Sequence, residues 1–357
     1  MTSSLILKKI SSPESLTNKY IHVDKSETSI KLLPSGKFNT SGEDVKSTFE
    51  DRNKYSIIIS ASTGCAMACN FCHITQKESP YIRISGQQIL DNLKEAITAE
   101  YLEHPEIANK YIKLCWMGMG EAILISKAVL DVTIELLDWV MLNGYAKGLD
   151  GVDIATVMPK IGDSWMADFT TLNTLLKKYD INPNNYIIPN SGFSSIKTYN
   201  SRSNLRLFYS LHSTEQHTRD LMIPNAMPID KALSKIKKFH EASQVNIIVH
   251  YMFMDSINDS NEQVEHLNTF MASNELDGFE LRILRYNGHN DSIKESNNFK
   301  SIIKNVSDAH SNFKVQFSSG FEILSACGQF VIDEYSNNPN YFESKAKNNN
   351  EINIVNI

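Results

Sequence analysis

The sequence contains few of the features that mark secreted or membrane proteins. Only five of its 357 residues are cysteines, and three of these fall within eight residues, so the paired cysteine framework of a disulfide-stabilised domain is absent. The apolar run in MTSSLILKKISS is too short for the core of a signal peptide, and no stretch approaches the length that spans a bilayer. These absences predict a soluble, cytoplasmic protein.

An excess of positive charge is also absent. Lysine and arginine number 35 against 41 aspartates and glutamates, which gives a formal net charge of −6. Binding to a nucleic acid would therefore have to depend on a local patch of cations. A hydrophobic content of 41% and a charged content of 21% are typical of globular proteins and exclude a fibrous or wholly disordered chain.

From residue 56 onward, short apolar runs alternate with helical patterns, as in repeated βα units around a parallel sheet. Ser85 is placed to cap one helix, and a second helix is predicted over 126–143, ending before Gly144. Six such units predict an α/β fold, and periodicity alone leaves a partial barrel and a doubly wound sheet both open. The predicted strands span residues 56–60, 111–116, 152–157, 205–211, 245–253 and 279–285.

The segments on either side of this repeat have a different character. Residues 1–55 contain no long amphipathic helix and are predicted to be a short, strand-rich lead-in. Residues 332–357 are rich in Asn, Ser, Lys and Glu and are expected to fray. The predicted core, including a C-terminal segment that contains Cys327, therefore covers residues 56–331.

The segment STGCAMACNFCHIT carries the strongest chemical signal, because it places Cys65, Cys69 and Cys72 in C-x3-C-x2-C spacing directly after the first predicted strand. Three thiolates on one tight loop select zinc or an iron–sulfur cluster. A structural zinc requires a fourth ligand, for which His73 is available, although no second C-x2-C or H-x3-H pair exists. Three cysteines without a fourth suit a cubane cluster with one open iron, and three unrelated buried cysteines are the remaining alternative.

This motif, with Phe71 before the last cysteine, resembles that of the radical S-adenosylmethionine (SAM) superfamily. The resemblance implies a partial (βα)6 barrel and a [4Fe-4S] cluster on Cys65, Cys69 and Cys72, whose open iron binds the amino and carboxylate groups of SAM. It also implies that a flavodoxin- or ferredoxin-type donor supplies the electron that cleaves SAM to a 5′-deoxyadenosyl radical.

Further segments resemble the RNA adenine methyltransferases of the RlmN and Cfr type. WMGMGEAIL is similar to that family's MGMGEP segment, SLHSTEQHTRD to its SLHAP segment with a following Arg-Asp pair, and RYNGHND to its SAM-binding asparagine segment. Taken alone, the first is a tight βα turn and the second a strand-end histidine. The SAM-binding residues that the resemblance implies are Gly120, Glu121, Ser210, Leu211, His212 and Asn287.

SACGQF resembles the family's ACGQ motif, in which the cysteine carries the methyl group. The resemblance implies that one SAM methylates Cys327 and that the radical from a second SAM abstracts hydrogen from the S-methyl group. The resulting carbon radical adds to an adenine carbon that polar methylation cannot reach. Without this context, an isolated cysteine is more simply explained as a small core hydrophobe.

The sequence departs from the family where a second cysteine resolves the covalent adduct between enzyme and RNA, because Ile58 stands at that position. Cys115 is predicted to face the barrel lumen on the adjacent strand, about 4.8 Å away, so a relocated resolving thiol and a packed side chain are both open. The family's helical RNA-binding domain has no counterpart in residues 1–55, and VQFSSGFEIL before Cys327 contains no basic residue. Both differences argue against simple docking to ribosomal RNA.

The sequence therefore predicts a methyltransferase that modifies carbon 2 or carbon 8 of an adenine in RNA (rRNA or tRNA), with catalytic Cys327 and with Cys115 as the candidate second thiol. One alternative is a radical SAM enzyme of the same fold with a different reaction or a non-ribosomal substrate. The other is a non-catalytic iron–sulfur protein that binds RNA or another protein.

Overall fold

The computed structural model describes residues 4–12, 15–32, 37–38, 44–45, 53–179, 204–273, 276, 279–286, 293–316 and 353–356. In these residues seven parallel strands form the centre of one sheet, each hydrogen-bonded to the next along the chain. The first six confirm the predicted strands, whereas the seventh, with four residues, was not predicted. They are β6 (Lys54–Ile58), β9 (Tyr111–Trp116), β10 (Gly148–Thr156), β11 (Leu205–Ser210), β12 (Asn246–Met252), β13 (Glu280–Leu284) and β14 (Phe313–Gln316).

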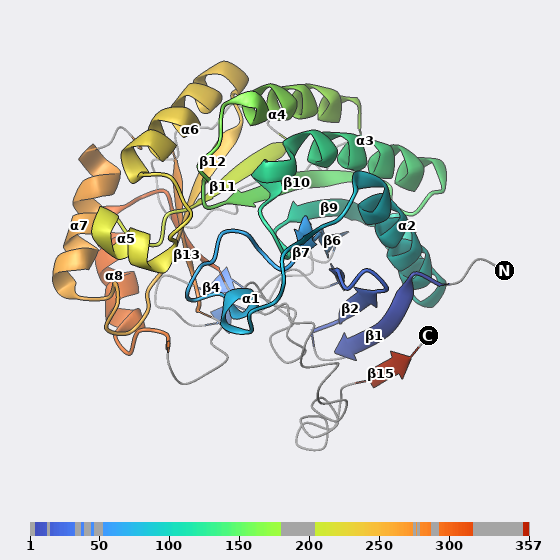
Figure 1. Cartoon of the computed structure of the whole chain (residues 1–357), viewed down its shortest axis with the longest axis horizontal. Helices are drawn as coiled ribbons and strands as arrows, with labels where there is room; N and C mark the ends of the chain where they lie inside the picture. Colours follow the sequence, from blue (N-terminus) through green and yellow to red (C-terminus); the bar gives the residue numbers. More distant parts are fainter. Residues whose placement is uncertain are drawn as a thin grey trace.

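Helices connect the parallel strands and cover the outer face of the sheet (Figure 1). The first begins at the predicted cap, where Ser85 Oγ accepts the N–H of Gln88 and the Gln88 side chain accepts the N–H of Ser85. The second ends before Gly144, which has the positive φ of 67° typical of such ends. The helices are α2 (Gly86–Glu103), α3 (Ser126–Leu142), α4 (Ser164–Leu175), α5 (Gln216–Met222), α6 (Ile229–Ser243), α7 (Asn261–Ser273) and α8 (Phe299–Ala309).

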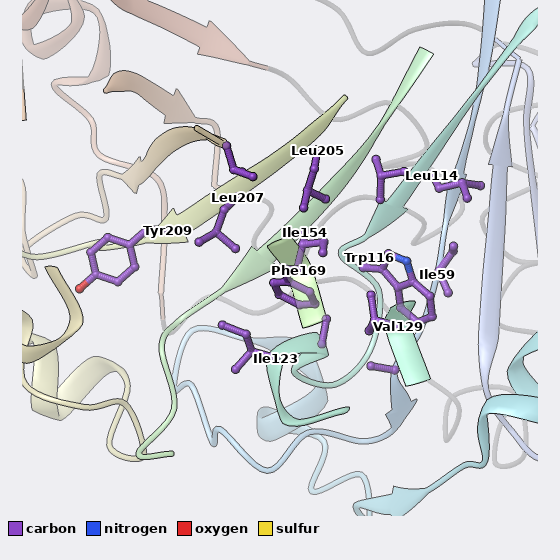
Figure 2. Packing of buried hydrophobic residues seen from close by; sticks show 14 of the residues in the cluster. Ile59, Leu114, Trp116, Ile123, Val129, Ile154, Phe169, Leu205, Leu207 and Tyr209 are labelled. Atoms are coloured by element: carbon purple, nitrogen blue, oxygen red, sulfur yellow. The ribbon is translucent and has the colours of Figure 1, made fainter. Parts of the chain in front are cut away.

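The two faces of the parallel strands differ sharply in composition. Leu114, Ile154 and Leu207 point to the helices and are at most 1% exposed, and Figure 2 shows them packing with Phe169 of α4. On β6, Ile57 belongs to this helix-facing core, whereas Ser56 and Ile58 lie on the inner face and are half-buried. Side chains along β6 thus alternate between the helix-facing core and the inner face, and the fold is the predicted α/β partial barrel.

Antiparallel strands extend the sheet at both ends. At one end β3 (Glu27–Lys31) pairs with β6, followed outward by β2 (Thr17–His22), β1 (Ile6–Ser12) and β15 (Asn353–Asn356). At the other end β14 pairs with β4 (Lys37–Phe38), which pairs with β5 (Asp44–Val45). Residues 353–356 thus have a place in the sheet, where the composition predicted a frayed tail.

Short elements complete the described structure. Those nearest the carboxyl end of β6 are the hairpin of β7 (Ser62–Thr63) with β8 (Ile82–Arg83), and α1 (His73–Gln76). Three 3-10 helices follow later strands or helices: η2 (Pro105–Asn109), η3 (Ala122–Ile125) and η4 (Leu176–Lys178). None of the helices described is long and apolar enough to cross a membrane.

Candidate functional site

The three predicted ligands lie together on the loop between β7 and α1, at the carboxyl end of β6. Cys72 caps α1, and its N–H donates to the carbonyl of Cys69 (3.0 Å). Cys65 and Cys72 both pack against the buried pair of Ile74 and Met119, while Cys69 is buried in a small apolar cluster with Met222. The loop therefore lies where the carboxyl ends of parallel strands meet, which is where α/β sheets bind ligands.

Several hydrogen bonds fix the backbone of this loop. The Asn225 side chain donates to the carbonyl of Ala66 (2.8 Å), and the Tyr286 hydroxyl, at the end of β13, donates to the carbonyl of Phe71 (3.1 Å). The N–H of Asn70 donates to the carbonyl of Met222 (2.9 Å). Sequence reasoning did not identify Asn225 or Tyr286, because neither belongs to a local motif and only the fold brings them to the loop.

The thiols are in an environment that disfavours the free thiolate. Burial, reinforced by the other two cysteines, raises the pKa of Cys69 well above its usual range. Burial also raises the pKa of Cys65 to about 12, opposed by the N–H groups of Met67 and Gly120, which point to its sulfur. Bound iron would supply the positive charge that three neighbouring thiolates require, so the donor set fits an iron–sulfur cluster.

Zinc, the other metal that the cysteine motif allows, requires a different arrangement of its ligands. Among the residues that the structure describes, no three His, Cys, Asp or Glu side chains are arranged to hold a single metal ion. Tetrahedral zinc requires its ligands to converge on one point. The cysteine ligands of a four-iron cluster bind different irons and so lie farther apart.

The loop after β9 has no room for side chains at its glycines. Gly120 has φ of 89°, and a Cβ there would lie 2.2 Å from Ser62 Oγ. A Cβ on Gly118 would lie 2.8 Å from the carbonyl oxygen of Ile59. Both positions therefore require glycine, and the close approach brings the Gly120 N–H to Cys65.

Glu121 follows directly and is buried between the ends of β9 and β10. Its two carboxylate oxygens accept the N–H groups of Ile123 (3.3 Å) and Val157 (3.0 Å). Burial raises its pKa to about 7, opposed by these bonds and by the Thr156 hydroxyl. A nearby ammonium group would stabilise the ionised form of such a buried carboxylate through a charge-assisted hydrogen bond.

His212 directly follows the fourth predicted strand and lies beside the cysteine loop. It has the uncommon φ of 57°, and its ring meets Phe71 edge-to-face with a centroid separation of 5.2 Å. Burial and the Arg219 guanidinium lower its pKa to about 3, so the ring is neutral. Within the described structure its Nδ1 has no hydrogen-bond partner, which leaves this atom for a ligand.

The neighbours of His212 have different orientations. Ser210 lies on the inner face, and its carbonyl accepts Nη2 of Arg219, which also donates to the carbonyl of Val157 (3.1 and 3.0 Å). Leu211 is buried in the core between sheet and helices. The Leu211 side chain is thus directed away from the cysteine loop, and only its backbone could contact a cofactor there.

Cys115 lies directly beside Ile58, as its register partner in the parallel pair of β9 and β6. It is 4% exposed, and burial raises its pKa to about 11. The thiol is therefore protonated at neutral pH and has little access to solvent. The other two predicted site residues, Asn287 and Cys327, lie outside the described residues.

Comparison of this sequence with those of known proteins identifies relatives at low identity. The chain is 24% identical over 294 residues to the dual-specificity RNA methyltransferase RlmN of Marinomonas sp. (strain MWYL1), covering 79% of this chain and 67% of that enzyme. It is 24% identical over 353 residues to a probable RNA methyltransferase of Rhodopirellula baltica, covering 92% of this chain and 81% of the relative. No protein-family model matches the chain.

The structural comparison agrees with the sequence comparison. The crystal structure of a radical SAM methyltransferase from Sphaerobacter thermophilus superposes with a TM-score of 0.59 at 14% identity, covering 88% of this chain and 76% of that one. The resemblance inferred from the motifs is confirmed: the chain is similar to RNA methyltransferases of the RlmN type and has the fold of a radical SAM methyltransferase.

Proposed function

We propose that this protein is a radical SAM methyltransferase that adds a methyl group to carbon 2 or carbon 8 of an adenine in RNA. The observation that carries the proposal is the contact between the loop of Cys65, Cys69 and Cys72 and the Gly120 backbone at the carboxyl ends of β6 and β9. Two separate motifs of one enzyme family thus meet in space. A [4Fe-4S] cluster held by Cys65, Cys69 and Cys72 would supply reductive cleavage of bound SAM, with the electron drawn from a flavodoxin- or ferredoxin-type donor.

The residues around the loop have distinct roles in this proposal. Glu121 binds the ammonium group of SAM, and the Gly120 backbone allows its close approach. His212 offers its unpartnered Nδ1 to SAM, and Ser210 and Asn287 complete the contacts, with Leu211 contributing through its backbone. Arg219 positions these groups, because it joins the carbonyls at the ends of β10 and β11.

Cys327 carries the methyl group from the first SAM to the adenine. Release of the product then requires a second thiol, and we assign this role to Cys115, whose position beside Ile58 places a thiol one strand away from where the family has it. The burial and raised pKa of Cys115 favour a second candidate function, a radical SAM enzyme with a different reaction that forms no adduct needing a thiol.

Anaerobic reconstitution with labelled SAM and total RNA, followed by nucleoside analysis, tests the proposal. Methylated adenosine in the digest is expected, and its loss in Cys327→Ala with an intact cluster assigns the carrier. SAM cleavage without label in RNA supports the altered-reaction candidate. Absence of SAM cleavage in the fully reconstituted protein contradicts both functions.

A further inference from the structure

The inner face of the parallel strands carries a band of charged side chains that the proposed chemistry does not use. Asp153 on β10 is 1% exposed and pairs with both Lys113 on β9 and Arg206 on β11, each at 2.6 Å. Lys54 on β6 pairs with Asp150 at 3.2 Å. Lys113 and Arg206 also act electrostatically on Lys54, so three cations share two acids in one group.

A second group continues this band on β13 and β14. Arg282 and Lys314 both pair with Glu280, and they are direct register partners, which places like charges side by side. On this face of the described parallel strands, five cations therefore meet three acids, an excess of two positive charges. We call these five residues the inner-face cation row: Lys54, Lys113, Arg206, Arg282 and Lys314.

Two buried polar atoms in this band have no hydrogen-bond partner in the described structure. One is Nη2 of Arg206, whose Nε is bonded to Asp153. The other is Nε2 of His250, a 5% exposed residue that lies in register between Ser210 and Arg282. Unsatisfied buried polar atoms are rare in folded proteins and call for a ligand or water.

Solvent reaches the cation row although it lies inside the fold. The side chains of Lys113 and Arg206 are 18% and 23% exposed, whereas Leu114 and Leu205 beside them on the outer face are at most 1% exposed. The Arg206 side chain is therefore partly open to solvent, and its planar guanidinium suits two oxygens of a phosphate.

Within the cation row, Arg206 is the member whose separation from the carboxyl end of its own strand fits a nucleotide-sized substrate. Arg206 lies four residues before Ser210 on β11, which is about 13 Å along a strand. We propose that the inner-face cation row binds the phosphate group of the substrate nucleotide while its base lies near the cysteine loop. The proposal rests on the proposed function for the adenine base, but the phosphate site itself follows from the charges and unpartnered atoms.

Calorimetric titration of the full-length protein with adenosine 5′-monophosphate, adenosine and inorganic phosphate tests this site. The monophosphate is expected to bind at least about tenfold more tightly than adenosine, as charge-assisted hydrogen bonds to a phosphate predict. Inorganic phosphate is expected to compete with it. Equal affinity for the nucleoside and the monophosphate, or no binding of either, would overturn the proposal.

Variants locate the site on the cation row. Arg206→Gln leaves Asp153 paired with Lys113, and it is expected to remove the preference for the monophosphate while adenosine affinity stays the same. Arg206→Lys should retain part of the preference, and Lys94→Gln on α2 should leave it unchanged. If Arg206→Gln does not fold, Arg282→Gln serves the same test, because Glu280 retains Lys314. Unchanged monophosphate affinity in a folded variant contradicts the assignment.

The titration needs neither iron nor SAM cleavage, so its outcome is independent of methylation. A phosphate preference without methylated RNA would retain the anion site and reject the proposed reaction. Methylated RNA without a phosphate preference would support the proposed reaction and reject the anion site.

Discussion

On the outer face of the parallel sheet, side chains such as Ile154 and Leu207 are buried and apolar, and they pack with helix residues such as Phe169 to join sheet and helices. On the inner face of the same strands, Asp153 and Arg206 alternate with them and form ion pairs with partial access to water. A buried ion pair contributes little net stability compared with apolar packing. The outer face therefore stabilises the fold, and the inner face keeps polar groups available for a ligand.

The largest effect expected from one substitution is the complete loss of the cluster in Cys69→Ala. Reconstituted wild-type protein should bind about four irons per chain, and the variant should bind none, because two of three ligands cannot hold the cluster. Iron content and the visible absorption spectrum measure this. Cys115→Ala is the matched control and should retain full iron, since Cys115 lies on a strand and outside the loop. Stoichiometric zinc with no capacity for iron in the wild type would refute the cluster.

A substitution in the core between sheet and helices should have the largest effect on stability. Phe169→Ala is expected to lower the free energy of unfolding by about 3–5 kcal/mol, because it leaves a cavity where the ring is fully buried against Trp165. Urea denaturation measures the change. Leu142→Ala, at an 86% exposed position, should change stability by less than about 0.5 kcal/mol. Similar losses in both variants would contradict the difference between buried and exposed positions.

An inner-face substitution should have a smaller, pH-dependent effect. Burial alone would raise the pKa of Asp153, but the Arg206 guanidinium and the Lys113 ammonium hold it at about 2, below its ordinary value. Asp153→Asn should therefore cost about 2 kcal/mol at neutral pH. The ionised carboxylate stabilises the fold fully above the unfolded pKa of about 4, and this stabilisation is lost as the pH falls toward 2.

Urea denaturation of Asp153→Asn and the wild type at several pH values checks this sign. The stability difference should shrink from pH 5 toward pH 2, the lower end being set by the folded pKa. A difference that grows on acidification would show that another group dominates.

Among the buried positions, the smallest stability effect is expected for Cys115→Ala, about 1 kcal/mol for a buried thiol. Its chemical effect distinguishes the two candidate functions. If Cys115 is the second thiol, the variant should accumulate a covalent RNA–protein species through Cys327 on a denaturing gel, and Ile58→Cys in that background should release it. Normal turnover of Cys115→Ala without an adduct would make Cys115 a packing residue.

Local sequence patterns predicted most of the parallel strands, the Ser85 cap and the end of α3, because each depends on residues close in sequence. The cysteine motif predicted the loop for the same reason. β14 was not predicted, because its four residues are too few to show the alternating pattern of a strand. The pairing of β3 with β6 is antiparallel and follows from contacts that no local pattern encodes.

The sequence predicted only those residues of the candidate site that belong to local motifs. Asn225 and Tyr286 come from other parts of the chain to hold the loop, and no spacing marks them. Leu211 matches a motif, yet strand alternation turns its side chain into the helix-facing core. The pairing of Asp153 with Lys113 and Arg206 depends on the register of three neighbouring strands, and this register cannot be predicted from the amino-acid composition.

The short covalent link between β3 and β4 limits the distance between the two ends of the parallel sheet. Lys31 lies beside Ser56 at one end of the parallel strands, and Lys37 lies beside Gln316 at the other end. Six peptide units separate Lys31 from Lys37, and even fully extended they reach only about 20 Å. The covalent chain thus keeps the two ends of the sheet close to each other. Any ligand that lies on the inner face between these two ends has to fit within that span.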